Sequence, residues 1–202
     1  MTETVAHRAL FNGKENSVEG IKHYVKLGIG IEIDIRYNKN GAYISHDKQD
    51  GGELFEKACE IAKNSKIIMA IHIKEIEAVK EVVNLLEKYS IKNYFLFDTD
   101  HNNLSKIIKT RKIGEYVNKK PIKLKQKILW CDEVQGKWYD EKLISDLHKN
   151  NNIIYAVSLE VFKKCSKEEM IAEWKRLTKL GIDGICTDFP EELIKFSKGD
   201  LN

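Results

Sequence analysis

The sequence predicts an α/β protein built as a small TIM-type (β/α)8 barrel. Strand-like and helix-like segments alternate along the chain, which is typical of parallel strands joined by right-handed crossover helices. The chain has 202 residues, which is near the lower size limit for eight such units. An open, doubly wound sheet is the rival architecture, but no glycine-rich phosphate-binding loop follows the first strand-like segment.

Seven segments combine β-branched and aromatic residues in short runs, as buried strands do. They are residues 4–7, 30–37, 66–73, 94–98, 127–132, 152–159 and 183–188. Residues 112–117 supply the eighth strand. Residues 41–46 predict an extra strand, which forms a hairpin with the second one.

Helix signals lie between these strands. One helix has apolar residues at three- and four-residue spacing, namely Ile76, Val79, Val82, Val83 and Leu86. Another starts from a capping box that joins Ser166 to Glu169. Gly28 and Gly181 follow the apparent ends of two helices, where a left-handed cap suits a residue without Cβ.

The composition indicates one soluble, globular domain over residues 1–202. Hydrophobic residues make up 42% of the chain and charged residues 32%, which excludes the disordered and membrane-spanning classes. The 34 basic and 31 acidic residues give a net charge of only +3, so we expect no nucleic-acid partner. Two prolines and no linker-like tract argue against a second domain.

The cysteines and the apolar runs bear on the compartment. Cys59, Cys131, Cys165 and Cys186 form no CxxC pair, which argues against a zinc knuckle and a disulfide framework. No run approaches the ~20 apolar residues of a transmembrane helix, and the early first strand leaves no room for a signal peptide. We therefore expect reduced thiols and a cytoplasmic protein.

Two carboxylates mark the second strand as chemically active. Side chains alternate along a strand, so Glu32 and Asp34 share one face and the neighbouring isoleucines share the other. Two rises of about 3.3 Å place their Cα atoms roughly 7 Å apart, close enough for both to reach one cation. Carboxylates that face a barrel interior need such a counter-charge.

Basic side chains follow the same edge. His72 and Lys74 share a face of the third strand, His7 and Arg8 end the first strand, and His46 ends the extra strand. Active sites of TIM barrels lie at the carboxyl ends of the strands. Two imidazoles, cationic side chains and a metal that converge there suit cleavage of a phosphodiester.

Five short motifs, in this order, resemble the glycerophosphodiester phosphodiesterase family within the phospholipase C-like phosphodiesterase barrels. They are AHR (6–8), ENS (15–17), EID (32–34), HD (46–47) and TDFP (187–190). The match covers roughly the first fifty residues and the last twenty. It implies a TIM-type barrel that hydrolyses a small glycerophosphodiester-like substrate in lipid metabolism, with one divalent cation, usually Mg²⁺ or Ca²⁺.

The resemblance also implies roles for individual residues. Histidines 7 and 46 are the acid and base, and Arg8 binds phosphate together with the lysine retained on the third strand. Asn16 lines the site with Glu15, and Glu32 and Asp34 hold the metal. The full set of candidate site residues is His7, Arg8, Asn16, Glu32, Asp34, His46, His72 and Lys74.

The third strand departs from the family pattern. Members usually carry Glu-x-Lys there, whereas this chain has His72 and Lys74. An imidazole ligand removes one negative charge and moves the preference towards Mn²⁺ or Zn²⁺. Asp98, Asp132 or Glu160, all near strand ends, could supply the missing oxygen instead.

Three functional readings stay open at this point. Water attacks the phosphate directly in the first. A neighbouring hydroxyl of the substrate attacks in the second, as in phospholipase-like cleavage through a cyclic phosphate. In the third, the chain is a non-catalytic phosphate-binding barrel. Two histidines with titrating side chains favour an enzyme, because binding alone has little use for them.

Overall fold

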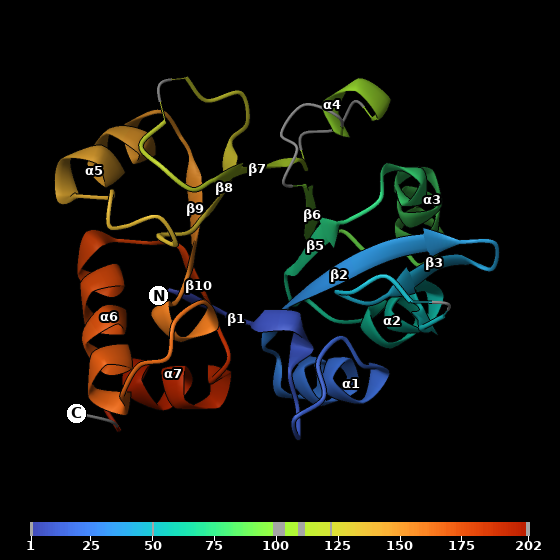
Figure 1. Ribbon diagram of the computed structural model, residues 1–202, viewed down its shortest axis with the longest axis horizontal. Helices are drawn as coiled ribbons and strands as arrows, with labels where there is room; N and C mark the ends of the chain where they lie inside the picture. The colour runs from blue at the N-terminus through green and yellow to red at the C-terminus, as the bar shows by residue number, and fades with distance from the viewer. Residues whose placement is uncertain (1, 50, 99–103, 109–111, 122, 201–202) are drawn as a thin grey trace. The chain divides into compact units, whose positions relative to one another are not determined.

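The computed structural model describes residues 2–49, 51–98, 104–108, 112–121 and 123–200 (Figure 1). The chain forms two compact units, one comprising Ala6–Ile113 and the other Met1–Val5 with Gly114–Asn202. Strands and helices alternate within each unit, as the sequence predicts. That all 202 residues form a single domain stays a prediction.

The Ala6–Ile113 unit is built on a mixed sheet in the order β4-β3-β2-β5-β6. Its strands are β2 (Gly30–Asn38), β3 (Gly41–Ile44), β4 (Glu53–Leu54), β5 (Met69–Ile73) and β6 (Tyr94–Phe97). Strand β5 runs parallel to both β2 and β6, whereas β2, β3 and β4 are joined antiparallel. The predicted hairpin is therefore confirmed. Strand β4 was not predicted, because two residues leave no alternating pattern.

The helices of this unit alternate with its strands. They are η1 (His7–Ala9), α1 (Val18–Leu27), α2 (Phe55–Ala62), η2 (Ile76–Ala78), α3 (Val79–Lys88) and α4 (Leu104–Ile107). The helix predicted around residues 76–86 is divided into a short 3-10 turn, η2, and α3. The hydroxyl of Ser17 caps α1 by accepting a hydrogen bond from Gly20 N at 3.1 Å. Gly28 ends α1 with φ 71°, the left-handed conformation expected of it. Helix α1 packs against α2 and β2.

The other unit carries a sheet in the order β1-β10-β9-β8-β7. Its strands are β1 (Glu3–Ala6), β7 (Gly114–Val117), β8 (Ile128–Cys131), β9 (Ile153–Val157) and β10 (Gly184–Thr187). Its helices are α5 (Glu141–Lys149), η3 (Leu159–Val161), α6 (Lys167–Leu180) and α7 (Pro190–Ser197). Strands β7 to β10 pair in parallel, one after the next. The strand predicted over residues 112–117 is confirmed as β7.

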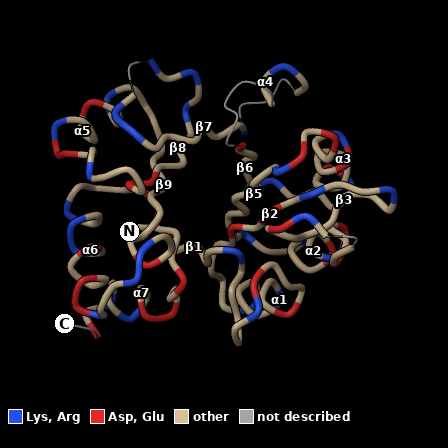
Figure 2. The backbone as a smooth tube through the Cα atoms, in the orientation of Figure 1, with Lys and Arg blue, Asp and Glu red and all other residues tan. Residues whose placement is uncertain are grey.

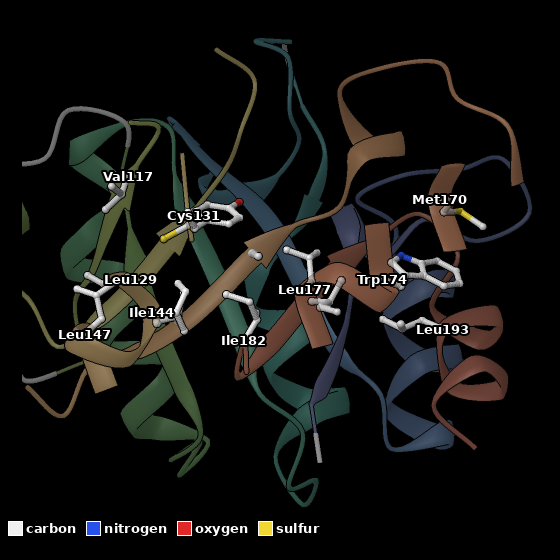
Figure 3. Packing of buried hydrophobic residues seen from close by; sticks show 14 of the residues in the cluster. Val117, Leu129, Cys131, Ile144, Leu147, Met170, Trp174, Leu177, Ile182 and Leu193 are labelled. Atoms are coloured by element: carbon white, nitrogen blue, oxygen red, sulfur yellow. The ribbon is translucent and has the colours of Figure 1, made fainter. Parts of the chain in front are cut away.

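A hydrophobic core holds this second unit together (Figure 3). Trp174 of α6 is fully buried in it, and its indole N–H donates to Ser158 Oγ at 2.9 Å. The capping box of Ser166 and Glu169 at the start of α6 is confirmed, and Gly181 closes the helix with φ 82°. Both ends of α6 are therefore fixed by residues that the sequence already marks.

Candidate active site

Strand β2 places two carboxylates on one buried face. Glu32 is 3% exposed and Asp34 is 1% exposed, while the isoleucines that alternate with them are fully buried on the opposite face. Figure 2 shows that β2 carries both acidic and basic positions. The burial predicted for this pair is thus confirmed. Two buried carboxylates on one strand face require partners, because an unpaired buried charge is strongly disfavoured.

The register of β5 brings His72 to this pair. Asp34 and His72 are direct partners across the parallel β2–β5 ladder. In such a ladder, paired residues project from the same face of the sheet. His72 Nδ1 lies 3.0 Å from Asp34 Oδ1. One ligand atom each from Glu32, Asp34 and His72 lie within 4.8 Å of one another.

Asp34 is the centre of the polar contacts. Its Oδ1 faces His72 and lies 3.6 Å from Lys74 Nζ. Its Oδ2 accepts a hydrogen bond from Asn16 Nδ2 at 3.0 Å and lies 3.5 Å from Arg8 Nε. Burial by itself raises the pKa of Asp34, but the hydrogen bond from His72 and the charge of Lys74 hold that pKa well below its usual value. Asp34 is therefore ionised at neutral pH.

Glu32 has the opposite character. Burial raises its pKa to about 7, the charge of Asp34 adds to this, and His7 and Arg8 oppose it. The backbone N–H of Arg8 donates to Glu32 Oε2 at 2.9 Å. A cation at this position would favour the ionised carboxylate, because metal binding displaces protons from its ligands.

The turn after β1 aims backbone groups at the carboxylates. Arg8, Ala9 and Asn16 have φ of 49°, 45° and 51°, in the left-handed region that L-residues other than glycine rarely adopt. The turn is held by Asn16 N, which donates to Arg8 O at 2.6 Å. Asn16 also accepts from Asp34 N at 2.9 Å. Strained backbone of this kind is concentrated at functional sites.

His72 is partly buried, and one of its ring nitrogens is left unused. Its ring stacks on Phe97 with centroids 4.6 Å apart. Burial lowers its pKa, although the contact with Asp34 opposes the change, so the imidazole is neutral. Because ionised Asp34 only accepts hydrogen bonds, Nδ1 carries the proton and Nε2 a lone pair. Among the described residues, Nε2 has no hydrogen-bond partner.

The two histidines predicted as acid and base adjoin this cluster. His7 is close enough to lower the pKa of Glu32, and the charge of His46 contributes to the lowered pKa of His72. His46 Nδ1 lies 2.8 Å from Asp47 Oδ1. All eight predicted site residues therefore belong to one neighbourhood of the Ala6–Ile113 unit. Their assigned roles stay predictions.

Asp98, Asp132 and Glu160 lie outside the group of described side chains that could converge on an ion. Within the described part of the chain, the group able to converge on an ion consists of Glu32, Asp34 and His72. Asp132 and Glu160 lie in the other unit. There Asp132 Oδ1 accepts from Val134 N at 3.1 Å, and Glu160 accepts from the hydroxyls of Ser158 and Thr187.

Sequence reasoning missed Arg36 and Glu75. Arg36 Nε donates to His46 O at 2.9 Å, and its Nη1 donates to Glu75 Oε1 at 3.0 Å. Glu75 also accepts from Tyr37 N at 2.8 Å. A signal was present, because Arg36 follows Glu32 and Asp34 at the same two-residue spacing and so shares their strand face. The contact to His46 depends on how the hairpin folds back, which spacing does not reveal.

Solved structures share the fold of the whole chain. A glycerophosphodiester phosphodiesterase from Parabacteroides distasonis aligns at TM-score 0.72 and 16% identity, covering 98% of each chain. A glycerophosphoryl diester phosphodiesterase from the same organism aligns at TM-score 0.71 and 13% identity, covering 100% of this chain and 87% of the other. No family model and no curated protein matches the sequence.

A Ca²⁺-dependent phosphatidylinositol-specific phospholipase C from Streptomyces antibioticus has the same fold. It aligns at TM-score 0.68 and 9% identity, covering 95% of each chain. The TIM-type α/β fold class and the resemblance to phospholipase C-like phosphodiesterases are thereby confirmed. Within the described residues, no helix has the length and apolar character that crossing a bilayer requires.

Proposed function

We propose that this chain, which has the fold of the glycerophosphodiester phosphodiesterases, is a metal-dependent phosphoric diester hydrolase acting on a small glycerophosphodiester-like substrate. One observation carries the proposal. Two buried carboxylates, a neutral imidazole with an unpartnered nitrogen, two cationic side chains and two further histidines meet around strands β2 and β5. A merely structural cluster of buried charges would pair its members and leave no coordinating atom over.

The donor set fits one divalent cation. Glu32 and Asp34 offer hard oxygen ligands, and His72 offers a nitrogen of the kind that Mn²⁺ and Zn²⁺ accept more readily than Ca²⁺ or Mg²⁺ do. A bound cation would polarise the phosphoryl oxygens and stabilise the negative charge that develops on them. The contact of His72 Nδ1 with Asp34 Oδ1 fixes the ring, as neighbouring carboxylates do for metal-bound histidines.

Arg8 and Lys74 bind the phosphate in this proposal. Their side chains are 24% and 18% exposed, and both approach Asp34 at a distance longer than a hydrogen bond. Arg8 Nη1 also donates to the more exposed Glu15 at 2.8 Å. Glu15, Glu32 and Asp34 carry three formal negative charges against the two positive charges of Arg8 and Lys74. A divalent cation would therefore leave a site of charge +1, which a singly charged phosphodiester neutralises.

His7 and His46 exchange protons with the reacting oxygens. One imidazole takes a proton from the attacking hydroxyl, and the other gives a proton to the departing oxygen. His46 is suited to a fixed position because Arg36 holds its carbonyl and Asp47 contacts its Nδ1. His7 stands at the start of η1, on the strained turn that also reaches Glu32.

Hydrolysis of bis(p-nitrophenyl) phosphate with Mg²⁺, Mn²⁺, Ca²⁺ or Zn²⁺ tests the proposal. Metal-dependent release of nitrophenol is expected, and His7→Ala and His46→Ala should each lower the rate by about 10²- to 10⁴-fold. His23→Gln is the matched control, because His23 lies on α1 and stacks on Phe11. If no metal supports turnover while phosphate still binds, the chain is the non-catalytic barrel.

The route of attack is a separate question with its own experiment. If water attacks directly, a glycerophosphodiester cleaved in H₂¹⁸O yields a monoester carrying one ¹⁸O. If a neighbouring substrate hydroxyl attacks, a cyclic phosphate without ¹⁸O appears first, and ³¹P NMR distinguishes the two products. The same two histidines serve either route.

A further inference from the structure

The small net charge of the chain hides a strongly basic region. Residues 101–131 contain nine basic residues and one acidic residue, Glu115. The remainder holds 25 basic and 30 acidic residues, since the totals are 34 and 31. The region is therefore +8 while the rest of the chain is −5. Lysines are concentrated most densely over residues 119–127, here called the lysine segment, which holds five of them and no acidic residue.

The described residues of the lysine segment, 119–121 and 123–127, lie on the surface of the unit that contains Gly114–Asn202. The segment connects β7 to β8, and Figure 2 shows repeated basic positions along this connection. Its five lysines are all exposed, namely Lys119, Lys120, Lys123, Lys125 and Lys127. Leu124 between them is only partly exposed and packs against the hydrophobic core. The backbone is thereby anchored while the ammonium groups face solvent.

Three of the five lysines have no acidic partner among the described residues. No ion pair between described residues includes Lys119, Lys120 or Lys123. Lys127 Nζ donates to the carbonyl of Asn150 rather than to a carboxylate. The carboxylate of Glu115 accepts from the backbone N–H groups of Lys125 and Gln126, at 2.7 and 3.1 Å.

A cavity of about 400 Å³ separates the segment from α5. Its walls combine Lys123, Lys125 and Lys127 with Asp146 of α5. That carboxylate is already paired with Lys142 at 2.7 Å and with Lys149 at 3.1 Å. The face that adjoins the lysine segment is therefore itself short of free negative charge.

We propose that the lysine segment docks this protein on an anionic membrane surface. Clusters of four to eight basic residues are attracted to the negative potential of such a surface. The residue types favour a bilayer over a nucleic acid. Residues 118–127 contain neither arginine nor an aromatic side chain, and these are the residues that clamp phosphates in a fork and stack on bases. Lysines alone suit a diffuse layer of charge.

Flotation with lipid vesicles tests the docking. The full chain is mixed with vesicles of phosphatidylcholine containing about 30% phosphatidylserine, or of phosphatidylcholine alone, at about 50 mM salt. The protein is expected to bind the anionic vesicles only. It should be released at about 500 mM salt, where the screening length falls to a few ångströms.

A triple variant, Lys119→Gln with Lys120→Gln and Lys123→Gln, should bind the anionic vesicles about 100-fold more weakly, from the usual contribution of each surface lysine. The matched control replaces Lys22, Lys57 and Lys80, three exposed lysines of α1, α2 and α3, and should keep most of the binding. Thermal unfolding of each variant checks that it is folded.

Three results would overturn the docking. In the first, the parent chain does not bind anionic vesicles. In the second, the two triple variants lose vesicle binding equally. In the third, the parent chain binds a short single-stranded RNA but not the vesicles. Equal losses would mean that only net charge matters. The proposal does not depend on the phosphodiesterase activity, because vesicle binding is measured without turnover.

Discussion

Each unit buries a cluster of charged side chains, and the two clusters are built differently. In the Gly114–Asn202 unit, Arg176 bonds to both Glu133 and Glu173, with Nε 3.0 Å from Glu173 Oε2. The second oxygen of Glu133 accepts from the backbone N–H groups of Trp138 and Tyr139, at 2.7 and 3.2 Å. Each charged side chain of this cluster is paired with another, as expected of a structural ion network.

In the cluster of the Ala6–Ile113 unit, the cationic side chains stand away from the central carboxylate, Asp34. Arg8 Nε and Lys74 Nζ stand 3.5 and 3.6 Å from Asp34, beyond hydrogen-bond length for such groups, and His72 Nε2 has no partner among the described residues. Buried charge alone therefore does not identify a functional site. Incomplete pairing around Asp34 is the feature that supports a functional site, because the unused donor and acceptor atoms are available to an ion or a substrate.

The largest expected effect tests this difference directly. Asp34→Asn keeps the shape of the side chain but removes the charge that His72, Lys74 and Arg8 face. We expect turnover of a model phosphodiester to fall by about 10³-fold, the loss typical of removing one pre-organised electrostatic group. Circular dichroism below the unfolding transition checks that the variant is folded, so that the loss of turnover is measured on folded protein.

Glu133→Gln is the counterpart in the paired cluster. It leaves Arg176 with one carboxylate instead of two, so the free energy of unfolding should fall by about 3 kcal/mol. Turnover per folded molecule should stay as in the parent chain. A Glu133→Gln variant that keeps its stability but loses turnover would contradict this prediction, because the reaction would then depend on the Glu133 cluster.

A smaller effect concerns the unpartnered nitrogen of His72. His72→Glu restores the carboxylate usual in the glycerophosphodiester phosphodiesterase family, and a third negative charge suits hard cations better. The ratio of activity with Mg²⁺ to activity with Mn²⁺ should rise by about 10- to 100-fold, the range typical of altered metal-site residues. Isothermal titration with each metal provides a readout separate from activity. An unchanged metal preference in both measurements would exclude His72 from the ligand set.

Much of this cluster follows from strand periodicity. The two-residue repeat places Glu32 and Asp34 on one face of β2, and the same repeat places His72 and Lys74 on one face of β5. Spacing alone therefore predicts which site residues each of the two strands contributes. The pairing of Asp34 with His72 requires the parallel register, which a single sequence implies only through the barrel hypothesis. The left-handed turn at Arg8 and Asn16 was not predicted, because neither residue type demands positive φ.

The contacts of the paired cluster could not be predicted from the sequence. Glu133 and Arg176 are 43 positions apart and meet because α6 packs close to the end of β8. No periodicity connects them. Strand β4 and the contact of Arg36 with His46 were not predicted either. Strand β4 is short, and the position of both features depends on how the hairpin turns back. Local pattern predicts faces of elements, whereas contacts between distant elements depend on packing.

The smallest expected effect concerns Arg36, whose described contact with the predicted site residues is a hydrogen bond to His46. Its Nε holds the carbonyl of His46, and Glu75 holds its Nη1. Arg36→Met should lower kcat by about 10-fold with little change in KM, because a misplaced acid or base slows proton transfer without weakening substrate binding. Lys48→Gln is the control, since Lys48 lies 4.0 Å from the same Glu75 oxygen and is 82% exposed.

A double-mutant cycle separates positioning from folding. If Arg36 acts through His46, the loss in Arg36→Met with His46→Ala should equal the loss in His46→Ala alone, because the residue to be positioned is gone. Additive losses would assign Arg36 a purely structural role in the hairpin. Partial recovery in Arg36→Lys would support positioning, since an ammonium can still donate to one carbonyl but cannot bridge it to Glu75 with the geometry of a guanidinium.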